Sequence, residues 1–372
     1  MTIADAKNTV VLAGKKLVEA GLIARTWGNV SCRISESHFV ITPSGRDYLS
    51  LTPEDIVEVA ISDCSYTGDV KPSSEKGVHA LVYKLHPEMN FVIHTHQDNA
   101  SAISAAPVDS IKVSEESFPS LHGEVLCAAY GLPGTKKLRR NVEKALISSK
   151  GNAVIMKNHG ALCFGQDYEE AFKTSHELEM ACELVIKEQF YSISNQSCAD
   201  MIDISEYALS KMTGRQVVVN KTISPIPMDS ERGDEKHSEI HKEIYNSNTE
   251  INHILHSKSL ATLAVSCAGI RPKPLLDDFA QIAGVGVDNV DIDPYKILSA
   301  LKGSSAVLIH NNGALCCGSS RSDAEALSMV LEKNCMAYIS AALYGKIKPI
   351  NRLECHLMRF VYKKKYSKLK TK

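Results

Sequence analysis

Apolar residues along the first half of the chain alternate between the spacing of helices and that of strands. Residues 3–20 carry apolar side chains at helical spacing, and Gly21 follows, as glycine often does just past a helix. Similar patterns predict further helices at 75–86, 136–148 and 168–189. Short apolar runs predict strands at 29–34, 38–42, 91–94 and 153–156. This alternation of strands and helices is typical of an α/β domain.

The pattern then weakens and later repeats. Residues 190–232 contain Ser, Asn, Asp and Pro with few apolar periods, which predicts a linker with some local structure. Beyond it, residues 250–258 align with 88–96, and residues 306–318 align with 153–165, where 8 of 13 positions are identical. Because the order also matches, we interpret the second half as a duplicated domain.

A predicted helix follows each copy of the longer repeat. Asp167 and Glu170 are spaced as a capping box before the first, and Ser322 and Glu325 before the second. The second copy is shorter, because nothing before residue 232 resembles the early glycine-containing turns of the first. We therefore expect two domains, at 1–220 and 221–372.

Composition excludes several classes of protein. The net charge is −1, from 42 Lys and Arg against 43 Asp and Glu, which argues against a nucleic-acid-binding protein. No apolar run approaches the roughly 18 residues of a membrane span. The first residues lack the long apolar stretch of a secretory signal, and 11 cysteines without a C-x-x-C indicate reduced thiols. These features predict a cytoplasmic protein that binds neither nucleic acid nor membrane. The lysines of residues 363–372 predict a solvated tail.

Histidines follow two of the predicted strands. His94 and His96 are two positions apart at the end of one strand, so both side chains face the same side. His159 follows another strand, and Glu75 opens a helix. Three imidazoles and one carboxylate suit zinc with room for a substrate, and a similar set can also hold Mn²⁺ or Co²⁺.

Three short segments have the residue types of an anion site. Tight turns with free backbone N–H groups are predicted at Gly28-Asn29 and at Ser44-Gly45. Ser73 and Ser74 lie at a helix N-terminus, where the N–H groups and the helix dipole favour phosphate. Each segment alone is typical of ordinary turns and caps. Together, beside a metal cluster, they predict a phosphorylated substrate.

These motifs occur in the order seen in a known family. The sequence resembles the class II aldolase/adducin family over about residues 5–190, and residues 232–345 resemble the later part of the same domain. The matching segments are Trp27–Ser31, Ile41–Gly45, Pro72–Glu75, His94–His96 and Asn158–Gly160. The resemblance implies a three-layer α/β/α domain with a central, mainly antiparallel sheet, here in tandem.

The resemblance also implies residue roles. His94, His96 and His159 would be zinc ligands, and Glu75 would be a fourth ligand as well as the general acid/base. The substrate phosphate would be held by Gly28, Asn29, Ser44, Gly45, Ser73 and Ser74. The implied reaction is cleavage of a ketose 1-phosphate to dihydroxyacetone phosphate and an aldehyde.

Other members of the family leave alternatives open. Sugar-phosphate 4-epimerases resembling this protein usually carry Asp where Glu75 stands, so Glu favours the aldolase. The dehydratases are disfavoured because no cysteine lies near the Ser73–Glu75 turn in the sequence. A non-catalytic, adducin-like binding protein is a further alternative. The residues Ser114–Phe118 contain no tyrosine where fuculose aldolases have one, which leaves the proton donor to the leaving group unassigned, with Tyr130 as a structural residue.

The second copy lacks the candidate site. His256 aligns with His94, but Lys258 replaces His96 and Asn312 replaces His159. Counting 162 positions from Glu75, as from His94 to His256, leads to His237. We therefore predict no catalytic metal in the second domain. Since family members resemble fourfold rings, we expect a homo-oligomer, with two chains forming a pseudo-fourfold ring or with a larger assembly. The alternative is that the second domain serves only stability.

Overall fold

The computed structural model describes residues 1–23, 27–194, 204, 224–225 and 235–367. The chain divides into two compact units, Met1–Gln189 and Phe190–Lys372. The expected domain boundary at residue 220, and most of the predicted linker, lie outside the described residues.

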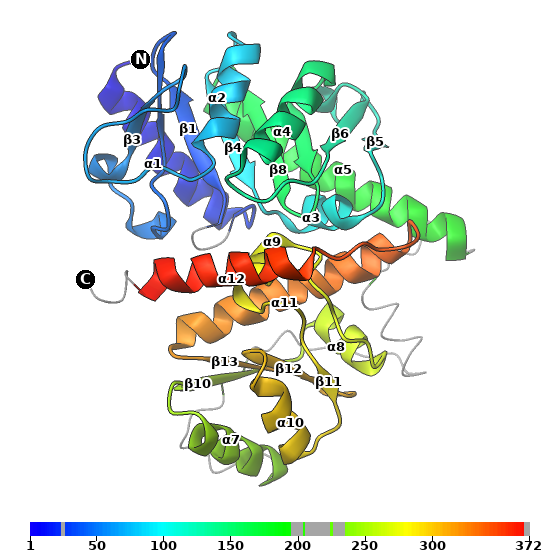
Figure 1. The fold of residues 1–372 in the computed structure, drawn as a ribbon. Coiled ribbons are helices and arrows are strands. Elements are labelled where there is room, and N and C mark those ends of the chain that lie inside the picture. Colours follow the sequence, from blue (N-terminus) through cyan, green and yellow to red (C-terminus); the bar gives the residue numbers. More distant parts are fainter. Residues whose placement is uncertain (24–26, 195–203, 205–223, 226–234, 368–372) are drawn as a thin grey trace. The chain divides into compact units, whose positions relative to one another are not determined.

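The first unit is built on a large mixed sheet (Figure 1). Its strand order is β3-β2-β1-β4-β8-β7-β6-β5. Every neighbouring pair is antiparallel except β6 and β7, which confirms the mainly antiparallel sheet. The strands are β1 Asn29–Arg33, β2 His38–Ile41, β3 Val57–Ala60, β4 Phe91–Thr95, β5 Ser110–Lys112, β6 Glu124–Ala128, β7 Ala153–Met156 and β8 Gly160–Gly165.

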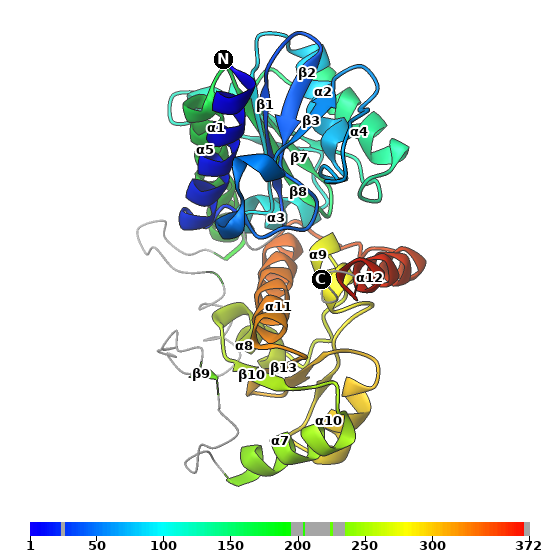
Figure 2. The ribbon, with the colours of Figure 1, turned by 90° about the vertical axis from the view of Figure 1, so that its left-hand side faces the viewer.

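Helices cover both faces of this sheet, as Figure 2 shows. One core joins the sheet to α2 and α4, through residues such as Val78 and Leu138. A second core joins the opposite face to α1 and α5, through residues such as Val10 and Ala171. The helices are α1 Ile3–Glu19, α2 Lys76–Leu85, α3 Asp98–Ala105, α4 Lys136–Ser148 and α5 Tyr168–Ser194. The three layers follow from the strands, whose successive side chains enter opposite cores.

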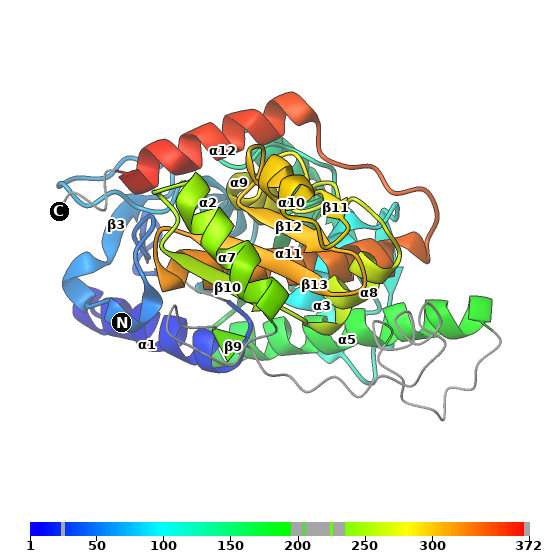
Figure 3. The ribbon, with the colours of Figure 1, turned by 90° about the horizontal axis from the view of Figure 1, so that it is seen from below.

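The second unit repeats this plan with fewer strands. Its sheet has the order β11-β12-β13-β10-β9 among the residues described. Figure 3 shows α7 and α10 lying over strands β10, β12 and β13, and these elements share one core. The strands are β9 Ser224–Pro225, β10 His253–Ser257, β11 Asn289–Val290, β12 Ala306–Ile309 and β13 Gly313–Gly318. The helices are α7 Glu235–Ser247, α8 Leu260–Cys267, α9 Asp277–Ile282, α10 Pro294–Leu301, α11 Arg321–Ala342 and α12 Arg352–Ser367.

The strand registers confirm the duplication. In the first unit His94 pairs with Leu162 and Thr95 pairs with Ala161. In the second unit the aligned residues pair in the same way, His256 with Leu315 and Ser257 with Ala314. No counterpart of β2 or β3 occurs in the described part of the second unit, which agrees with the shorter repeat.

The elements predicted for the first unit lie close to where the periodicity placed them, whereas helix α3 and strands β3, β5, β6 and β8 were not predicted. Two helix boundaries, one in each unit, also differ from the prediction. Helix α5 continues to Ser194, into the segment interpreted as a linker. The predicted cap at Ser322 and Glu325 is wrong, because α11 already begins at Arg321 and the side chain of Ser320 accepts the hydrogen bond of the Asp323 N–H. Both pairs of residues have the same spacing, so the sequence pattern alone does not choose between them.

The structure can also be compared with two expectations from composition, reduced cysteines and the absence of a membrane span. The ten cysteines in the described residues are all free, and most of them are buried. Among the described helices, none combines the length and the apolar character needed to cross a membrane.

Candidate functional site

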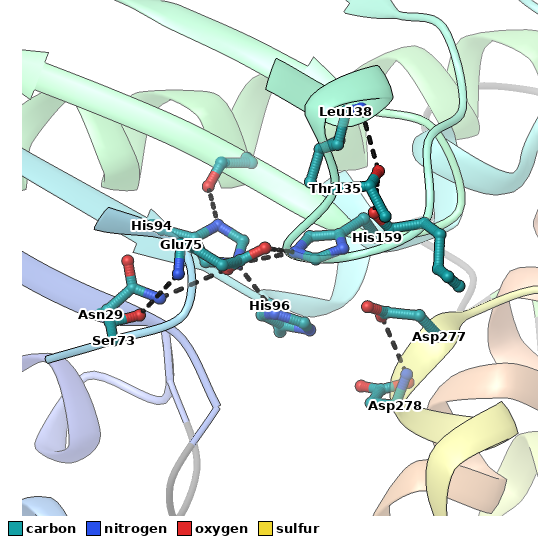
Figure 4. A network of polar contacts seen from close by, with 12 residues as sticks. Asn29, Ser73, Glu75, His94, His96, Thr135, Leu138, His159, Asp277 and Asp278 are labelled. Carbon is teal, nitrogen blue, oxygen red and sulfur yellow. Dashed lines mark hydrogen bonds and ion pairs between the residues drawn. The ribbon is translucent and has the colours of Figure 1, made fainter. Parts of the chain in front are cut away.

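The strand ends bring the three histidines together (Figure 4). His94 lies in β4, and His96 lies just beyond its end. His159 lies in the turn between β7 and β8, beside Asn158, whose φ of 58° is left-handed. The next residue must be small, because a Cβ on Gly160 would collide with the carbonyl oxygen of Thr95. This tight turn places His159 against the end of β4.

The imidazole nitrogens meet around Glu75. The Nε2 atom of His94 lies 3.0 Å from Nε2 of His96 and 3.0 Å from Nε2 of His159. The Glu75 carboxylate bridges two of the rings, with Oε2 3.0 Å from His94 Nε2 and Oε1 3.1 Å from His159 Nε2. The four residues are buried or nearly so, which keeps this cluster of polar atoms out of bulk water.

The proton positions favour a cation in this cluster. His94 Nδ1 donates to the carbonyl oxygen of Ala161 at 2.8 Å, so its Nε2 carries a lone pair in the neutral ring. That lone pair faces two other imidazole nitrogens and a carboxylate oxygen. Burial acts to raise the pKa of Glu75, but positive charge at His159 and His94, together with their hydrogen bonds, outweighs it and holds the pKa well below its usual value. With both rings neutral, a bound cation would supply that positive charge instead. Four electron-rich groups that converge in this way are a ligand set for a metal ion.

The spacing also fits a metal. Nitrogens bound to one tetrahedral zinc ion lie about 3.3 Å apart, close to the 3.0 Å separations seen here. The His94–Ala161 hydrogen bond fixes the ring so that Nε2 points inward, as outer partners of metal-bound histidines commonly do. The cluster can therefore hold a metal ion.

The predicted phosphate segments lie beside this cluster. Asn29 pairs with His94 across the sheet, and a Cβ on the preceding Gly28 would lie 2.5 Å from the His94 carbonyl oxygen. Ser73 accepts a hydrogen bond from the Glu75 N–H at 3.2 Å. The loop containing Ser44 and Gly45 is tied to the serine loop, as shown by the bonds from Ser44 N to Lys71 O at 2.9 Å and from Ser73 N to Thr42 O at 3.1 Å. All ten residues predicted for the site thus occupy one region of the first unit.

A small cavity opens at the start of α2. It has a volume of about 120 Å³ and is lined by Ser74, Glu75, Cys64, Lys76, Gly77, Val78, Gly134, Thr135, Leu138 and Arg139. Cys64 lines the same cavity as Ser74 and Glu75, so a cysteine does lie near this turn in space, and the prediction that none does is wrong. The loop after β3 folds back to this turn, which sequence distance did not reveal.

Sequence reasoning missed the residues behind Asn29. The Asn29 side chain points towards the cluster, where its Nδ2 donates to Glu75 Oε2 at 3.3 Å. Its oxygen contacts Nε2 of His79, a fully buried histidine. The sequence did contain a signal for His79, because it follows Glu75 by four residues, and residues four apart lie on the same side of a helix.

The second unit arranges the aligned residues differently. His256 Nε2 hydrogen-bonds to the backbone oxygen of Asn312 at 2.7 Å. Across the described part of the chain, a group of three or more potential metal ligands is found at His94, His96 and His159 and not in the second unit.

The family can now be assigned from comparison with known proteins. The family model described as "Class II Aldolase and Adducin N-terminal domain" matches residues 8–186 and again residues 192–339. The chain belongs to this family. The double match agrees with the duplicated fold, so the chain is a tandem class II aldolase-like protein.

Curated relatives are similar to about half of the length of this class II aldolase-like chain. A 5-deoxy-D-ribulose 1-phosphate aldolase of Bacillus thuringiensis is 31% identical over 186 residues, which is 50% of this chain and 85% of that protein. A 5-methylthioribulose-1-phosphate/5-deoxyribulose-1-phosphate aldolase of Escherichia coli is 31% identical over 48% of this chain and 82% of its own length. A 3-oxo-tetronate 4-phosphate decarboxylase of Haemophilus influenzae is 26% identical over 55% of this chain and 95% of its own length.

Solved structures include similar chains. An L-fuculose 1-phosphate aldolase is 29% identical, with a TM-score of 0.46, over 58% of this chain and 91% of its own. An L-fuculose-1-phosphate aldolase from Thermus thermophilus is 26% identical, with a TM-score of 0.44, over 52% of this chain and 98% of its own.

Proposed function

We propose that the protein is a metal-dependent aldolase that cleaves a ketose 1-phosphate to dihydroxyacetone phosphate and an aldehyde. The observation that carries the proposal is the convergence of His94, His96 and His159 on the Glu75 carboxylate, beside loops rich in Gly and Ser. Relatives named as ketose 1-phosphate aldolases support the choice of reaction.

Zn²⁺ is the proposed ion, held by His94, His96, His159 and Glu75, and Mn²⁺ or Co²⁺ would also suit this ligand set. When bound, such an ion polarises the substrate carbonyl and stabilises the negative charge left when the C3–C4 bond breaks. The chain's own contribution to the ion is orientation, through the hydrogen bond of His94 to Ala161.

Glu75 is the proposed acid/base. As the C3–C4 bond breaks, its carboxylate accepts the proton of the C4 hydroxyl, which becomes the aldehyde, and a proton is then delivered to C3. Two features suit this role. The low pKa of Glu75 provides the carboxylate form, and its position at the start of α2 leaves it beside the cavity lined by Ser74.

The phosphate of the substrate is assigned to the three loops next to Glu75. Ser73 and Ser74 precede α2, whose N-terminal N–H groups and dipole attract an anion. Gly28 and Gly45 have φ values of 85° and 75°, so each turn needs glycine and exposes backbone without a side chain. Ser44 and Asn29 complete the set. Because the Asn29 carboxamide already contacts Glu75, this residue links the phosphate loops to the acid/base.

The test is cleavage by the protein loaded with Zn²⁺. A panel of ketose 1-phosphates, beginning with 5-deoxyribulose 1-phosphate, is incubated with the protein, and dihydroxyacetone phosphate is followed with a coupled reductase. We expect release from at least one sugar and a loss of roughly 100- to 10,000-fold in Glu75→Gln, the range of general acid–base catalysis. Absence of release from every sugar by protein that retains its metal would refute the aldolase.

A second candidate function has specific support. The similarity to a 3-oxo-tetronate 4-phosphate decarboxylase extends over 95% of that protein. Decarboxylation of a 3-oxo acid and cleavage of a ketose both break the bond between the α and β carbons of a ketone. Measuring carbon dioxide released from that substrate separates the two reactions. A panel of pentulose 5-phosphates tests the 4-epimerase, and zinc binding without turnover on any substrate would favour the adducin-like binding protein.

We also propose that the protein is a homo-oligomer in which each chain contributes one complete and one degenerate unit, so that two chains form a pseudo-fourfold ring. The duplicated family domain supports this arrangement. A fully active monomer in light scattering would refute it. The cytoplasmic location stays a prediction.

A further inference from the structure

Buried polar side chains that are hydrogen-bonded one after another form a row, or file, that extends from Glu75 into the first unit. Asn29 Nδ2 lies 3.3 Å from Glu75 Oε2, and Asn29 Oδ1 contacts His79 Nε2. On the other side of the ring, His79 Nδ1 lies 2.6 Å from Ser31 Oγ, which lies 2.6 Å from the Tyr83 hydroxyl. Each of these five residues is at most 8% exposed. Buried polar groups are normally hydrogen-bonded, and this file satisfies its members in series.

The chemistry of each group fixes the direction of every hydrogen bond in the file. A carboxylate only accepts, so the NH₂ of Asn29 faces Glu75 and its carbonyl oxygen accepts from His79 Nε2–H. Burial, together with the nearby His94, lowers the pKa of His79 to about 3, so the ring is neutral and Nδ1 accepts. Ser31 therefore donates to His79, and Tyr83 donates to Ser31. All the donors point towards Glu75.

Two periodicities of the sequence bring these residues together. Asn29 and Ser31 are two apart on β1, so their side chains face the same side of the sheet. His79 and Tyr83 are four apart on α2 and continue the spacing that begins at Glu75. The core that contains Tyr83 packs α2 against this face of the sheet. The file is thus fixed by the same packing that forms the fold.

We propose that His79 is a positioning residue that orients the Asn29 carboxamide, and through it the carboxylate of Glu75. Without a donor at His79 Nε2, the carboxamide is free to turn its carbonyl oxygen towards Glu75, where two acceptors repel each other. Ser31 and Tyr83 hold the required tautomer of His79. The inference that cleavage depends on this file rests on the proposed function, whereas the orientation of Asn29 does not.

The experiment compares His79→Leu with His79→Gln. Leucine fills the space but makes no hydrogen bond, whereas glutamine supplies an N–H donor and a carbonyl acceptor. His86→Leu is the matched control, since His86 ends the same helix and stacks on Phe164 outside the file. Co²⁺ binding to each metal-free protein is followed by visible absorption in competition with a chelator, and kcat and KM are measured on the cleaved sugar.

We expect His79→Leu to weaken Co²⁺ binding by about 10- to 100-fold, the usual effect of losing an outer partner, with His79→Gln and His86→Leu within about threefold of the wild type. In cleavage, kcat should fall in His79→Leu by a larger factor than KM rises, because Asn29 is the one residue of the proposed phosphate set that His79 contacts. Equal losses of Co²⁺ affinity and kcat in His79→Leu and His79→Gln would overturn the proposal. They would show that the site depends on how the imidazole packs and not on its hydrogen bonds. An unaltered His79→Leu variant would also overturn the proposal.

A measurement on the wild type covers the case in which His79→Leu does not fold. Long-range ¹H–¹⁵N NMR of the metal-free protein, with the His79 signals assigned by their loss in His79→Gln, should show a neutral ring with its proton on Nε2. A proton on Nδ1, or a charged ring near neutral pH, would overturn the proposal. If no sugar is cleaved but Co²⁺ affinity and the tautomer follow the expected pattern, the proposed function fails and the positioning role stands.

Discussion

The two units of this chain keep the same backbone at the turn beside the candidate site and differ in the side chains there. Asn158 and Asn311 occupy the same turn with φ values of 58° and 60°. A Cβ on Gly160 would collide with the carbonyl oxygen of Thr95, and a Cβ on Gly313 would collide with that of Ser257. The turn that places His159 against β4 is therefore retained in a unit where Asn312 takes the place of this histidine.

A half-buried carboxylate at a helix start is retained in the same way. Glu179 accepts the N–H groups of Asn99 and Ala100 at the start of α3, at 2.8 and 3.1 Å. Its counterpart Glu332 accepts the N–H groups of Ala261 and Thr262 at the start of α8, at 3.0 and 2.8 Å. Both carboxylates satisfy N–H groups that have no partner within their helix. Residues that the fold needs are shared, whereas the residues assigned to chemistry occur in one unit.

The largest expected difference between the units concerns metal binding. His96→Ala should lower the affinity for Zn²⁺ by more than about 100-fold, beyond the loss of an outer partner, because it removes one of the proposed direct ligands. Lys258→Ala, the matched change in the second unit, should leave one ion per chain and the cleavage rate unchanged. Metal content after dialysis against a chelator checks both variants. Two ions per wild-type chain would break the comparison.

Much of the fold was predictable because its signals are local. The boundaries of α4 and β7 agree with those read from periodicity, and His159 does follow a buried strand. The pairing of the strands was not predictable in this way. That Asn29 lies opposite His94 depends on the register between β1 and β4, which joins residues distant in the sequence.

The candidate site was predictable in its residue types and not in its internal contacts. Resemblance to a family pointed to the histidines and Glu75, but the contact of His79 with Asn29 forms only once α2 packs on β1. Cys64 reaches the same cavity through the loop after β3. Contacts of this kind depend on how elements pack, and periodicity within one element does not contain that information.

A second prediction uses the cap of α3. Burial raises the pKa of Glu179 to about 7, although the N–H groups that it accepts act in the opposite direction. Since this folded-state pKa lies above the unfolded value, the unfolded chain loses the proton first, and stability falls as the pH rises from about 4.5 to 7. This group therefore contributes up to about 3 kcal/mol of stability below that range, which is lost across it.

Denaturant unfolding of the wild type and of Glu179→Gln, compared from pH 4.5 to 8, checks this effect. Glutamine does not titrate, so the stability cost of the substitution should be largest at low pH and should shrink as the pH rises. Glu332→Gln is the matched variant in the second unit. A cost of Glu179→Gln that is constant with pH would show that the carboxyl titrates equally in the folded and unfolded chains.

The smallest expected effects come from the shared turn, and they sharpen the comparison because both units should respond. Gly160→Ala and Gly313→Ala each force a Cβ against a carbonyl oxygen of the neighbouring strand, which should cost about 1–3 kcal/mol of stability. Gly313 has a φ of 79°, so its substitution adds backbone strain and should cost more. Denaturant unfolding of both variants measures these costs.

Metal affinity then separates the two units. Gly160→Ala should also weaken Zn²⁺ binding, because the turn that it disturbs carries His159, whereas Gly313→Ala should leave the affinity unchanged. The reverse result would place the metal in the second unit. If the two variants lost stability equally and neither changed the affinity, the turn would serve only the fold, and the position of His159 would have to be fixed by its contact with Glu75 instead.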